Sequence, residues 1–332
     1  MESFQRAKSK GLKSVLVSVV DLEGSSYRKP GVRMLILEDN TMVGAVSGGC
    51  VEKEILRQAQ SVFREDIPKI MTYDGRFRLG CDGILYVLIE PFNPSDAAIK
   101  AFNECFQNRN AFKLISYYKK EPGSLPCLGT RANINGNLFN LSSQNNTLSD
   151  QDKSLSVFDQ TLRPQMQLLI FGSEHDAVQL CKLAALTGFS VTIYANITEN
   201  KNQTDFPGSD HFVSLSFDQL NLETLDSQTA VVVMTHSLTQ DLKCLLALQY
   251  AKPVYLGLLG ATHKRELLLS KLIELSPDVE DGFLECIHGP AGLNIGAVTP
   301  QEIAISILSE ILAKFRNKTP KFLKDKNQGT LA

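Results

Sequence analysis

A cysteine preceded by two glycines stands at the start of a helical segment in the N-terminal half of the chain. The segment reads Ser47-Gly48-Gly49-Cys50, and the apolar residues within 51–63 recur at the spacing of a helix. Glycines at such a turn leave backbone N–H groups unpaired at a helix N-terminus, which favours binding of an anion or a phosphate. The helix dipole also favours the thiolate form of a cysteine in the first turn. These residues form our first candidate ligand site, and the alternative is a tight turn with a buried cysteine.

A second cysteine and a basic turn could complete the same site. Cys81 is flanked by glycines in GCDG, directly before an apolar run at 84–89, and glycines let a backbone approach a ligand closely. Arg28 lies in the turn-rich segment GSSYRKPG and could supply positive charge, as could Lys29 and Arg33. The alternatives are a plain turn at Cys81 and an exposed basic loop at Arg28.

Two histidines and a glycine follow apolar runs in the C-terminal half. Gly172 and His175 come after the run at 167–171, and His236 comes after the run at 230–234. Open α/β sheets bind ligands at the carboxyl ends of their strands, so the two histidines could face each other there and hold a metal or an anion. Two histidines are too few to define a metal site, so we assign no metal ligands and no catalytic residues. A hydrogen-bonded structural role is the alternative for both.

The turn after the first of these runs departs from a dinucleotide-binding fingerprint. Such a site needs G-x-G-x-x-G after the first strand and an acidic residue about 20 residues further on. Here Glu174 stands at the second glycine position, where it adds bulk and negative charge beside a phosphate. The acidic residue is also missing, because the second strand ends Tyr194-Ala195-Asn196. We therefore do not expect NAD or NADP to bind.

Strands and helices alternate differently in the two halves. In the N-terminal half, apolar runs predict strands at 14–20, 32–37, 42–46, 84–89 and 113–118, helices at 51–63 and 95–109, and a hairpin turn at Asn135-Gly136. In the C-terminal half, strands at 167–171, 190–194, 230–234 and 253–256 alternate with helices at 177–187, 242–249 and 300–315. This alternation is typical of βαβ units. The prediction is an α/β protein, in which an N-terminal α+β domain precedes a Rossmann-like domain with a doubly wound parallel sheet.

The domain boundaries follow from a change in composition near the middle of the chain. Residues 142–154 read SSQNNTLSDQDKS, which has no apolar periodicity and is typical of a linker or a long loop. We therefore expect an N-terminal domain at 1–141, a linker at 142–165, a Rossmann-like domain at 166–318 and a polar tail at 319–332.

Composition and charge argue against several classes of protein. The chain has 332 residues and a formal net charge of −2, so it lacks the basic surface that non-specific nucleic-acid binding requires. Its seven cysteines are scattered without a CxxC pair, so neither an iron–sulfur cluster nor a zinc knuckle is expected. We find no signal peptide and no long apolar run, and we expect a cytoplasmic protein with no nucleic-acid or membrane partner.

Several long motifs together resemble one known family. The N-terminal half contains GSSYRKPGVRM (24–34), GAVSGGCVE (44–52) and GCDGILYVLIEP (80–91). The C-terminal half contains VVVMTHSLTQDLKCL, YLGLLGATHKRELL and GPAGLNIGAVTPQEIAISILSEILA. In this order the motifs resemble those of the XdhC/CoxI family, the xanthine dehydrogenase accessory factors, over nearly the whole chain apart from the linker and the tail.

The resemblance implies a chaperone rather than an enzyme. Family members are understood to bind molybdenum cofactor (molybdopterin) transiently, to support its sulfuration with a cysteine desulfurase, and to help insert it into a molybdenum hydroxylase apoenzyme. They are generally regarded as homodimers. For this chain, the resemblance makes Ser47 to Cys50 the leading cofactor-contact segment and Cys81 the second.

Two other functions stay open where this chain departs from the family. The family has Gly-Ala-Gly-His after the first strand of its Rossmann domain and Asp-x-Arg after the second, whereas this chain has Glu174 in the first motif and Ala195 in the second. The main alternative is an oxidoreductase that binds NAD(P) in the Rossmann-like domain. A scaffold that only bridges the desulfurase and the apoenzyme is the third hypothesis.

Overall fold

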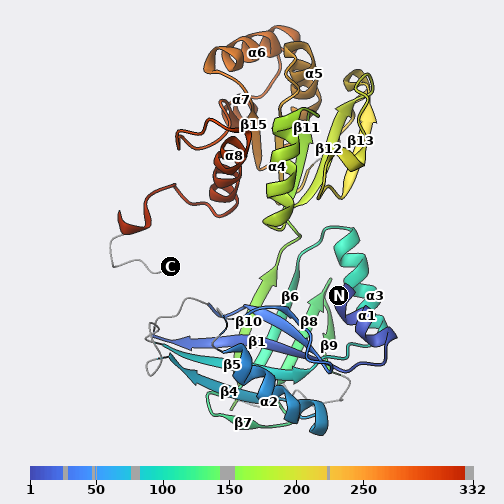
Figure 1. Cartoon of the computed structure of the whole chain (residues 1–332), viewed down its shortest axis with the longest axis vertical. Coiled ribbons are helices and arrows are strands. Elements are labelled where there is room, and N and C mark those ends of the chain that lie inside the picture. Colours follow the sequence, from blue (N-terminus) through green and yellow to red (C-terminus); the bar gives the residue numbers. More distant parts are fainter. Residues whose placement is uncertain are drawn as a thin grey trace. The chain divides into compact units, whose positions relative to one another are not determined.

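The computed structural model of the chain describes residues 1–24, 29–46, 49, 51–75, 83–142, 154–222 and 225–325. The chain divides into unit 1 (Met1–Pro164) and unit 2 (Gln165–Ala332), and each unit has sheets and buried cores of its own (Figure 1). The two units are described separately.

Two antiparallel sheets form the frame of unit 1. Its elements are, in chain order, α1 (Glu2–Ser9), β1 (Ser14–Glu23), β2 (Arg33–Leu37), β3 (Met42–Gly44), α2 (Glu52–Glu65), β4 (Lys69–Asp74), β5 (Ile84–Pro91), α3 (Asp96–Gln107), β6 (Phe112–Tyr118), β7 (Gly123–Ser124), β8 (Gly129–Ile134), β9 (Asn137–Asn140) and β10 (Ser156–Leu162). The first sheet has the strand order β3-β2-β1-β5-β4-β7, and the second has the order β10-β6-β8-β9.

β1 lies inside the first sheet and is apolar on both of its faces. Val15, Val17 and Val19 belong to a buried cluster with the apolar side chains of α2. Leu16 and Val20 belong to other buried clusters, which include side chains of the second sheet. Because side chains alternate along a strand, a continuous apolar run suits a strand that is covered on both faces.

Three strands of the first sheet run in the same direction, and two of them end together. β1, β3 and β4 run in one direction, because β2 separates β3 from β1 and β5 separates β1 from β4, with antiparallel pairing throughout. Glu23 at the end of β1 and Asp74 at the end of β4 both pair with Ile84 at the start of β5. We call the side of the sheet marked by Glu23, Asp74 and Ile84 the Glu23 edge.

Unit 2 contains one parallel sheet with helices on both faces. Its elements are β11 (Gln167–Phe171), α4 (His175–Leu186), β12 (Ser190–Asn196), β13 (His211–Leu215), β14 (Thr229–Val233), α5 (Leu238–Leu248), β15 (Tyr255–Leu258), α6 (Thr262–Leu275), α7 (Asp281–Cys286), β16 (Ile287–His288) and α8 (Pro300–Phe315), with short 3₁₀ turns at Gln203–Asp205 and Phe217–Gln219. The strand order is β13-β12-β11-β14-β15-β16. This is the doubly wound order of Rossmann folds, and it confirms the predicted fold class.

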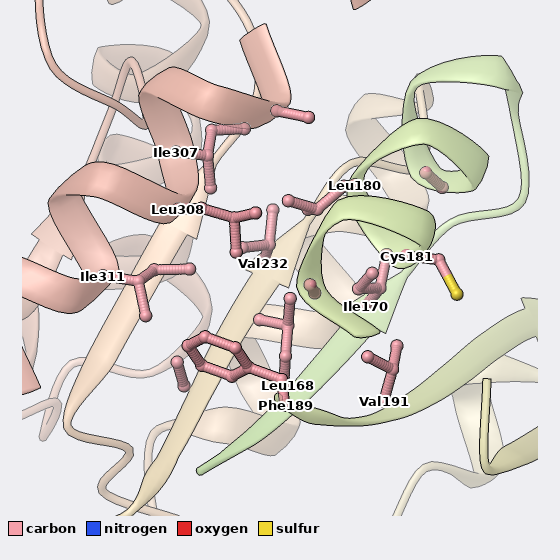
Figure 2. Close-up of a cluster of buried hydrophobic side chains, with 14 of the residues drawn as sticks. Leu168, Ile170, Leu180, Cys181, Phe189, Val191, Val232, Ile307, Leu308 and Ile311 are labelled. Atoms are coloured by element: carbon pink, nitrogen blue, oxygen red, sulfur yellow. The ribbon is translucent and has the colours of Figure 1, made fainter. Parts of the chain in front are cut away.

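α4 and α8 cover one face of this sheet. Figure 2 shows Ile307, Leu308 and Ile311 of α8 beside the side chains of α4 and the central strands. Leu180 of α4 and Val232 of β14 belong to the same buried cluster. Side chains of α5 and α6 form a second cluster with the opposite face of the sheet. Both faces of the central strands are therefore buried, as their near-continuous apolar sequences require.

The structure corrects the expected linker at 142–165. β10 lies in this range and pairs with β6 along seven residues, from Ser156↔Tyr118 to Leu162↔Phe112. Its sequence alternates between exposed and half-buried side chains, which is the pattern of a strand with one face to solvent and was hidden by the polar composition. Residues 143–153 of the expected linker lie outside the described residues. Sequence analysis also missed α1, β4, β7, β13, α6, α7 and β16.

The helices of the described ranges are short. α8 has 16 residues, whereas a membrane-spanning helix needs about 20 mainly apolar residues. No helix within these ranges combines the length and the apolar character that crossing a membrane demands. The described residues of the expected polar tail, 319–325, include a 3₁₀ turn at Leu323–Asp325.

Candidate functional sites

Most candidate residues of unit 1 lie in segments outside the described residues. They are Arg28, Ser47, Gly48, Cys50 and Cys81. The segments that contain them connect β1 to β2, β3 to α2, and β4 to β5. β1, β3 and β4 run in the same direction, so all three segments leave the first sheet in that direction. The segments after β1 and β4 begin at the Glu23 edge, whereas β3 ends at Gly44, level with Val17 of β1.

Gly49 is described, and its backbone N–H is already paired. Its φ is +115°, which favours glycine because side chains with a Cβ rarely adopt it. The N–H donates to Oε2 of Glu52, at 2.9 Å, in the first turn of α2. The expectation of an unpaired N–H is therefore wrong at Gly49, because a carboxylate of the chain itself accepts the bond, as carboxylates do at helix N-termini. An anion bound at this turn would need other donors.

A lysine at the Glu23 edge is held by two carboxylates. Nζ of Lys120 lies 3.0 Å from Oδ2 of Asp21 and 3.0 Å from Oε1 of Glu23. Tyr118 donates its hydroxyl to Asp21 at 2.8 Å, and burial together with this bond raises the pKa of Tyr118 to about 12. Burial acts to raise the pKa of Asp21, but the hydrogen bonds from Lys120 and Tyr118 outweigh it and lower this pKa. The cluster fixes the end of β1, next to the segment that carries Arg28.

An arginine and a glutamate link the first sheet of unit 1 to the second. Glu90 in β5 accepts hydrogen bonds from the N–H and the hydroxyl of Thr130 in β8, at 2.7 and 2.6 Å. Arg33 in β2 donates to the carbonyl of Gly31 at 3.1 Å and also to the side chain of Gln160 in β10. Nε and Nη2 of Arg33 are buried, and burial lowers the pKa of its guanidinium. Among the described residues, Nε and Nη2 have no hydrogen-bond partner, so the charge that we expected Arg33 to add to the site stays a prediction.

The crevice of unit 2 begins at Gly172, directly after β11. Its φ is +136°, and a Cβ at this position would overlap the carbonyl oxygen of Met234, directly after β14. The N–H of Gly172 donates to the carbonyl of Tyr194 in β12 at 2.9 Å. Only glycine allows this approach, so the packing of the three strand ends is sufficient to explain Gly172.

The two candidate histidines have different neighbours. Nε2 of His236 lies 3.8 Å from Oδ2 of Asp176, in the first turn of α4. Nε2 of His175 lies 3.5 Å from Nε2 of Gln179, one turn further along the same helix. Among the described residues, no group of three His, Cys, Asp or Glu side chains could hold a metal ion. At 3.8 Å, His236 and Asp176 are beyond hydrogen-bond distance, so the roles of the two histidines stay a prediction.

A carboxylate that sequence analysis missed lies beside the first turn of unit 2. Ser173 is 1% exposed, and its hydroxyl donates to Oε2 of Glu199. Glu199 lies in the turn after β12, where its N–H donates to the carbonyl of Asn196 at 2.9 Å. Sequence analysis noted that an acidic residue is missing at Ala195, and it did not identify Glu199 four residues further on. The signal for that turn was Asn196, whose side chain accepts two local hydrogen bonds.

A hollow of about 400 Å³ lies at the ends of β14 and β15. It is lined by Met234, His236, Leu238, Leu259, Gly260 and Lys264. Nζ of Lys264 lies 2.5 Å from Oδ2 of the buried Asp241 and donates to the carbonyl of Leu259 at 3.1 Å. The lysine of this hollow is therefore already paired with a carboxylate.

A separate polar cluster fixes the loop between β16 and α8. Glu310 accepts hydrogen bonds from the Tyr255 hydroxyl at 2.7 Å and the Gly292 N–H at 2.8 Å, and it pairs with Nδ1 of His288 at 2.8 Å. Burial acts to raise the pKa of Glu310, but these partners outweigh it and lower the pKa to about 2. A Cβ on Gly292 would overlap Oγ of Ser306 in α8. Close packing therefore accounts for the glycine in this part of the GPAGL motif.

The fold and the sites define a class of protein that joins an antiparallel two-sheet unit to a Rossmann-like unit with an altered nucleotide-binding turn. Two sequence models of known families match the two parts. The XdhC Rossmann domain matches residues 168–311, and the XdhC and CoxI family matches residues 7–74. The chain belongs to the XdhC and CoxI family.

Two relatives and one solved structure align with most of the chain. A Bacillus subtilis protein named as a probable xanthine dehydrogenase subunit is 29% identical over 316 residues, which cover 90% of this chain and 92% of the relative. An Escherichia coli protein named molybdenum cofactor insertion chaperone PaoD is 27% identical over 306 residues, which cover 91% and 83%. A crystal structure of a Bacillus halodurans protein described as a xanthine dehydrogenase has the same fold, with a TM-score of 0.76 over 96% of both chains at 24% identity.

Proposed function

We propose that this chain binds molybdenum cofactor and assists its insertion into a xanthine dehydrogenase-type molybdenum hydroxylase. Its family and the name of the Escherichia coli relative support this function. The observation that carries it for this chain is that the three strands leading into the candidate segments run in the same direction in the first sheet, and that β1 and β4 end together at the Glu23 edge. Segments that are far apart in sequence but leave a sheet in one direction can form a single ligand site.

The residue types in these segments suit a cofactor with an anionic phosphate and a metal bound by sulfur. Cys50 and Cys81 are soft donors, which suit a metal of this kind. Within the described part of unit 1, Lys120 is paired with Asp21 and Glu23. Positive charge for the phosphate would therefore come from the segment of Arg28. The contacts of Gly172, His175 and His236 favour structural roles in unit 2.

The proposal includes partners and a location. A cysteine desulfurase would supply the sulfur during sulfuration of the bound cofactor, and a molybdenum hydroxylase apoenzyme would receive it. We further propose that the chain acts as a homodimer in the cytoplasm and binds the cofactor only transiently, as a chaperone and not as an enzyme.

Retention of the cofactor tests the proposal. The full-length protein is incubated without oxygen with molybdenum cofactor released from a molybdenum enzyme and is then separated by gel filtration. Bound pterin is measured by fluorescence after oxidation, and bound molybdenum by mass spectrometry. We expect Cys50→Ala to bind at least about tenfold more weakly than the wild type, a change of about 1.4 kcal/mol. Cys81→Ala should weaken binding less.

A matched cysteine variant separates the site from general effects. Cys127 is a free cysteine of unit 1 and is partly exposed, so Cys127→Ala should bind the cofactor like the wild type. The loaded wild-type protein should also activate a cofactor-free molybdenum hydroxylase. The proposal is wrong if the wild type retains no cofactor, or if Cys50→Ala retains as much as the wild type does.

A further inference from the structure

The basic side chains at the crevice of unit 2 are largely engaged with other groups of the protein. Lys264 forms an ion pair with Asp241 at 2.5 Å, and His236 lies 3.8 Å from a carboxylate of α4. Arg265, in the first turn of α6, donates through Nε to a backbone carbonyl of the edge strand β16 at 3.3 Å. The neighbouring His263 is exposed. Little positive charge in this described part is therefore left to neutralise a phosphate.

Two carboxylates occupy the turn at which a dinucleotide would place its pyrophosphate. In doubly wound sheets the pyrophosphate lies at the N-terminus of the first helix, which here is α4. Glu174 is the N-cap residue of α4, and its side chain is exposed and makes no capping bond. Glu199 reaches the same turn from β12 and accepts the hydrogen bond of the buried Ser173. A carboxylate at this position interacts favourably with the helix dipole, as a bound phosphate would.

We propose that Glu199 and Glu174 are specificity-determining residues that exclude diphosphate ligands, including NAD(P), from the crevice of unit 2. The carboxylate of Glu199 is an anion that the protein itself supplies. Its side chain accepts a hydrogen bond from the Ser173 hydroxyl, and its backbone N–H donates to the carbonyl of Asn196. A pyrophosphate brought to the start of α4 meets two negative charges, and like charges placed together weaken binding strongly. The ligands that suit this crevice are neutral or positively charged and present N–H or O–H donors to the two carboxylates.

The inference does not rest on the proposed function, because it concerns only unit 2 and is tested with nucleotides. If both the inference and the proposed function are correct, the phosphate of the molybdenum cofactor binds to unit 1. This consequence rests on the proposed function.

Gain of nucleotide binding tests the inference. NADH and ADP-ribose are titrated by calorimetry into the full-length wild type, Glu199→Gln, Glu174→Gly and the double variant. Glutamine at 199 can still accept the bond from Ser173, and glycine is tolerated at an N-cap, so both changes preserve the fold. We expect no saturable binding to the wild type up to roughly 1 mM and at least about tenfold tighter binding to the double variant. The gained binding should weaken as salt is added.

A control variant removes one negative charge elsewhere on the same unit. Glu274 is exposed near the C-terminal end of α6, so Glu274→Gln changes the net charge equally and should gain no nucleotide binding. Circular dichroism establishes that each variant is folded. Saturable binding of NADH to the wild type that Glu199→Gln abolishes would overturn the inference and make Glu199 a nucleotide ligand. A folded double variant that binds neither nucleotide would overturn it as well.

Discussion

Glu90 links the two sheets of unit 1 through a single buried carboxyl group. It is 1% exposed, and Thr130 donates two hydrogen bonds to its two oxygens. Burial raises its pKa to about 7, although the bonds from Thr130 and the charge of Arg33 act in the opposite direction. A buried carboxylate is stable only with such partners, because the protein interior solvates charge poorly. The charge state of Glu90 therefore changes near neutral pH.

We predict that Glu90 makes the protein less stable as the pH rises from 4.5 to about 7. Between these values the folded chain keeps a proton that the unfolded chain has released, and above them the folded chain must hold a buried charge. The total loss should be on the order of 3 kcal/mol in the free energy of unfolding. Glu90→Gln, which cannot ionise, should remove most of this slope. Urea unfolding followed by circular dichroism at several pH values measures it.

An exposed glutamate provides the control for this prediction. Glu65 lies in the last turn of α2 and is exposed, so Glu65→Gln should keep the pH dependence of the wild type. Glu310 has the opposite effect on stability, but only below pH 4.5, because its pKa is lowered to about 2. Equal slopes for Glu90→Gln and the wild type between pH 4.5 and 7 would show that another group is responsible.

At the scale of single elements, α8 combines a strong start signal with a buried face. Thr299 accepts a hydrogen bond from the N–H of Glu302, whose side chain accepts the N–H of Thr299, and Pro300 occupies the first turn. This capping box was predicted from the sequence motif TPQE. Ile307 and Ile311 then pack against α4 and the sheet (Figure 2). The helix therefore depends on a local signal at its start and on tertiary packing along its length.

We predict that Thr299→Ala lowers the free energy of unfolding by about 1 kcal/mol. The change removes the side-chain oxygen that accepts the Glu302 N–H and leaves that donor without its partner. Thr299→Ser keeps the oxygen and should lose at most a few tenths of this amount. The midpoints of urea unfolding of the two variants measure the difference. Equal losses in both would show that the methyl group, and not the cap, stabilises α8.

At the scale of the whole molecule, the chain consists of two units that each bury their own apolar residues. The last strand of unit 1 is β10, and only a few residues separate it from β11, the first strand of unit 2. Gln160 of β10 accepts a hydrogen bond from Arg33 of the first sheet. β10 is therefore both an edge strand of the second sheet and the final connection to unit 2.

We predict that a fragment of residues 1–164 folds cooperatively and that a fragment of residues 1–141 does not. The shorter fragment lacks β10, so β6 loses its partner along seven residues and becomes an unpaired edge. Thermal unfolding followed by circular dichroism should show a sharp transition for 1–164 and a broad one or aggregation for 1–141. A sharp transition of equal midpoint in both fragments would mean that β10 is dispensable for the fold of unit 1.

The sequence predicted elements better than it predicted contacts. The strands at 14–20, 84–89, 167–171 and 230–234 were found because continuous apolar runs mark strands buried on both faces. β10 was missed because its alternation is weak and its composition resembles a linker. Gly172 was singled out as a candidate cofactor-binding residue, and the structure shows why the turn requires a glycine there. Sequence analysis missed Glu199 as the partner of Ser173 and Glu52 as the partner of Gly49. Nothing local in the sequence identifies the partner of a side chain.

The sequence by itself determined the position of many elements, the doubly wound class of the C-terminal half and the resemblance to one family. These properties follow from local periodicity, caps and motifs, which act over a few residues. Only the tertiary structure decided that β10 belongs to unit 1 and that Ser173 donates to Glu199. It also decided that Gly49 is paired with Glu52 and that Arg33 donates to Gln160. The physical reason is that hydrogen bonds and ion pairs depend on the distance between side chains in space, which the packing of whole elements sets.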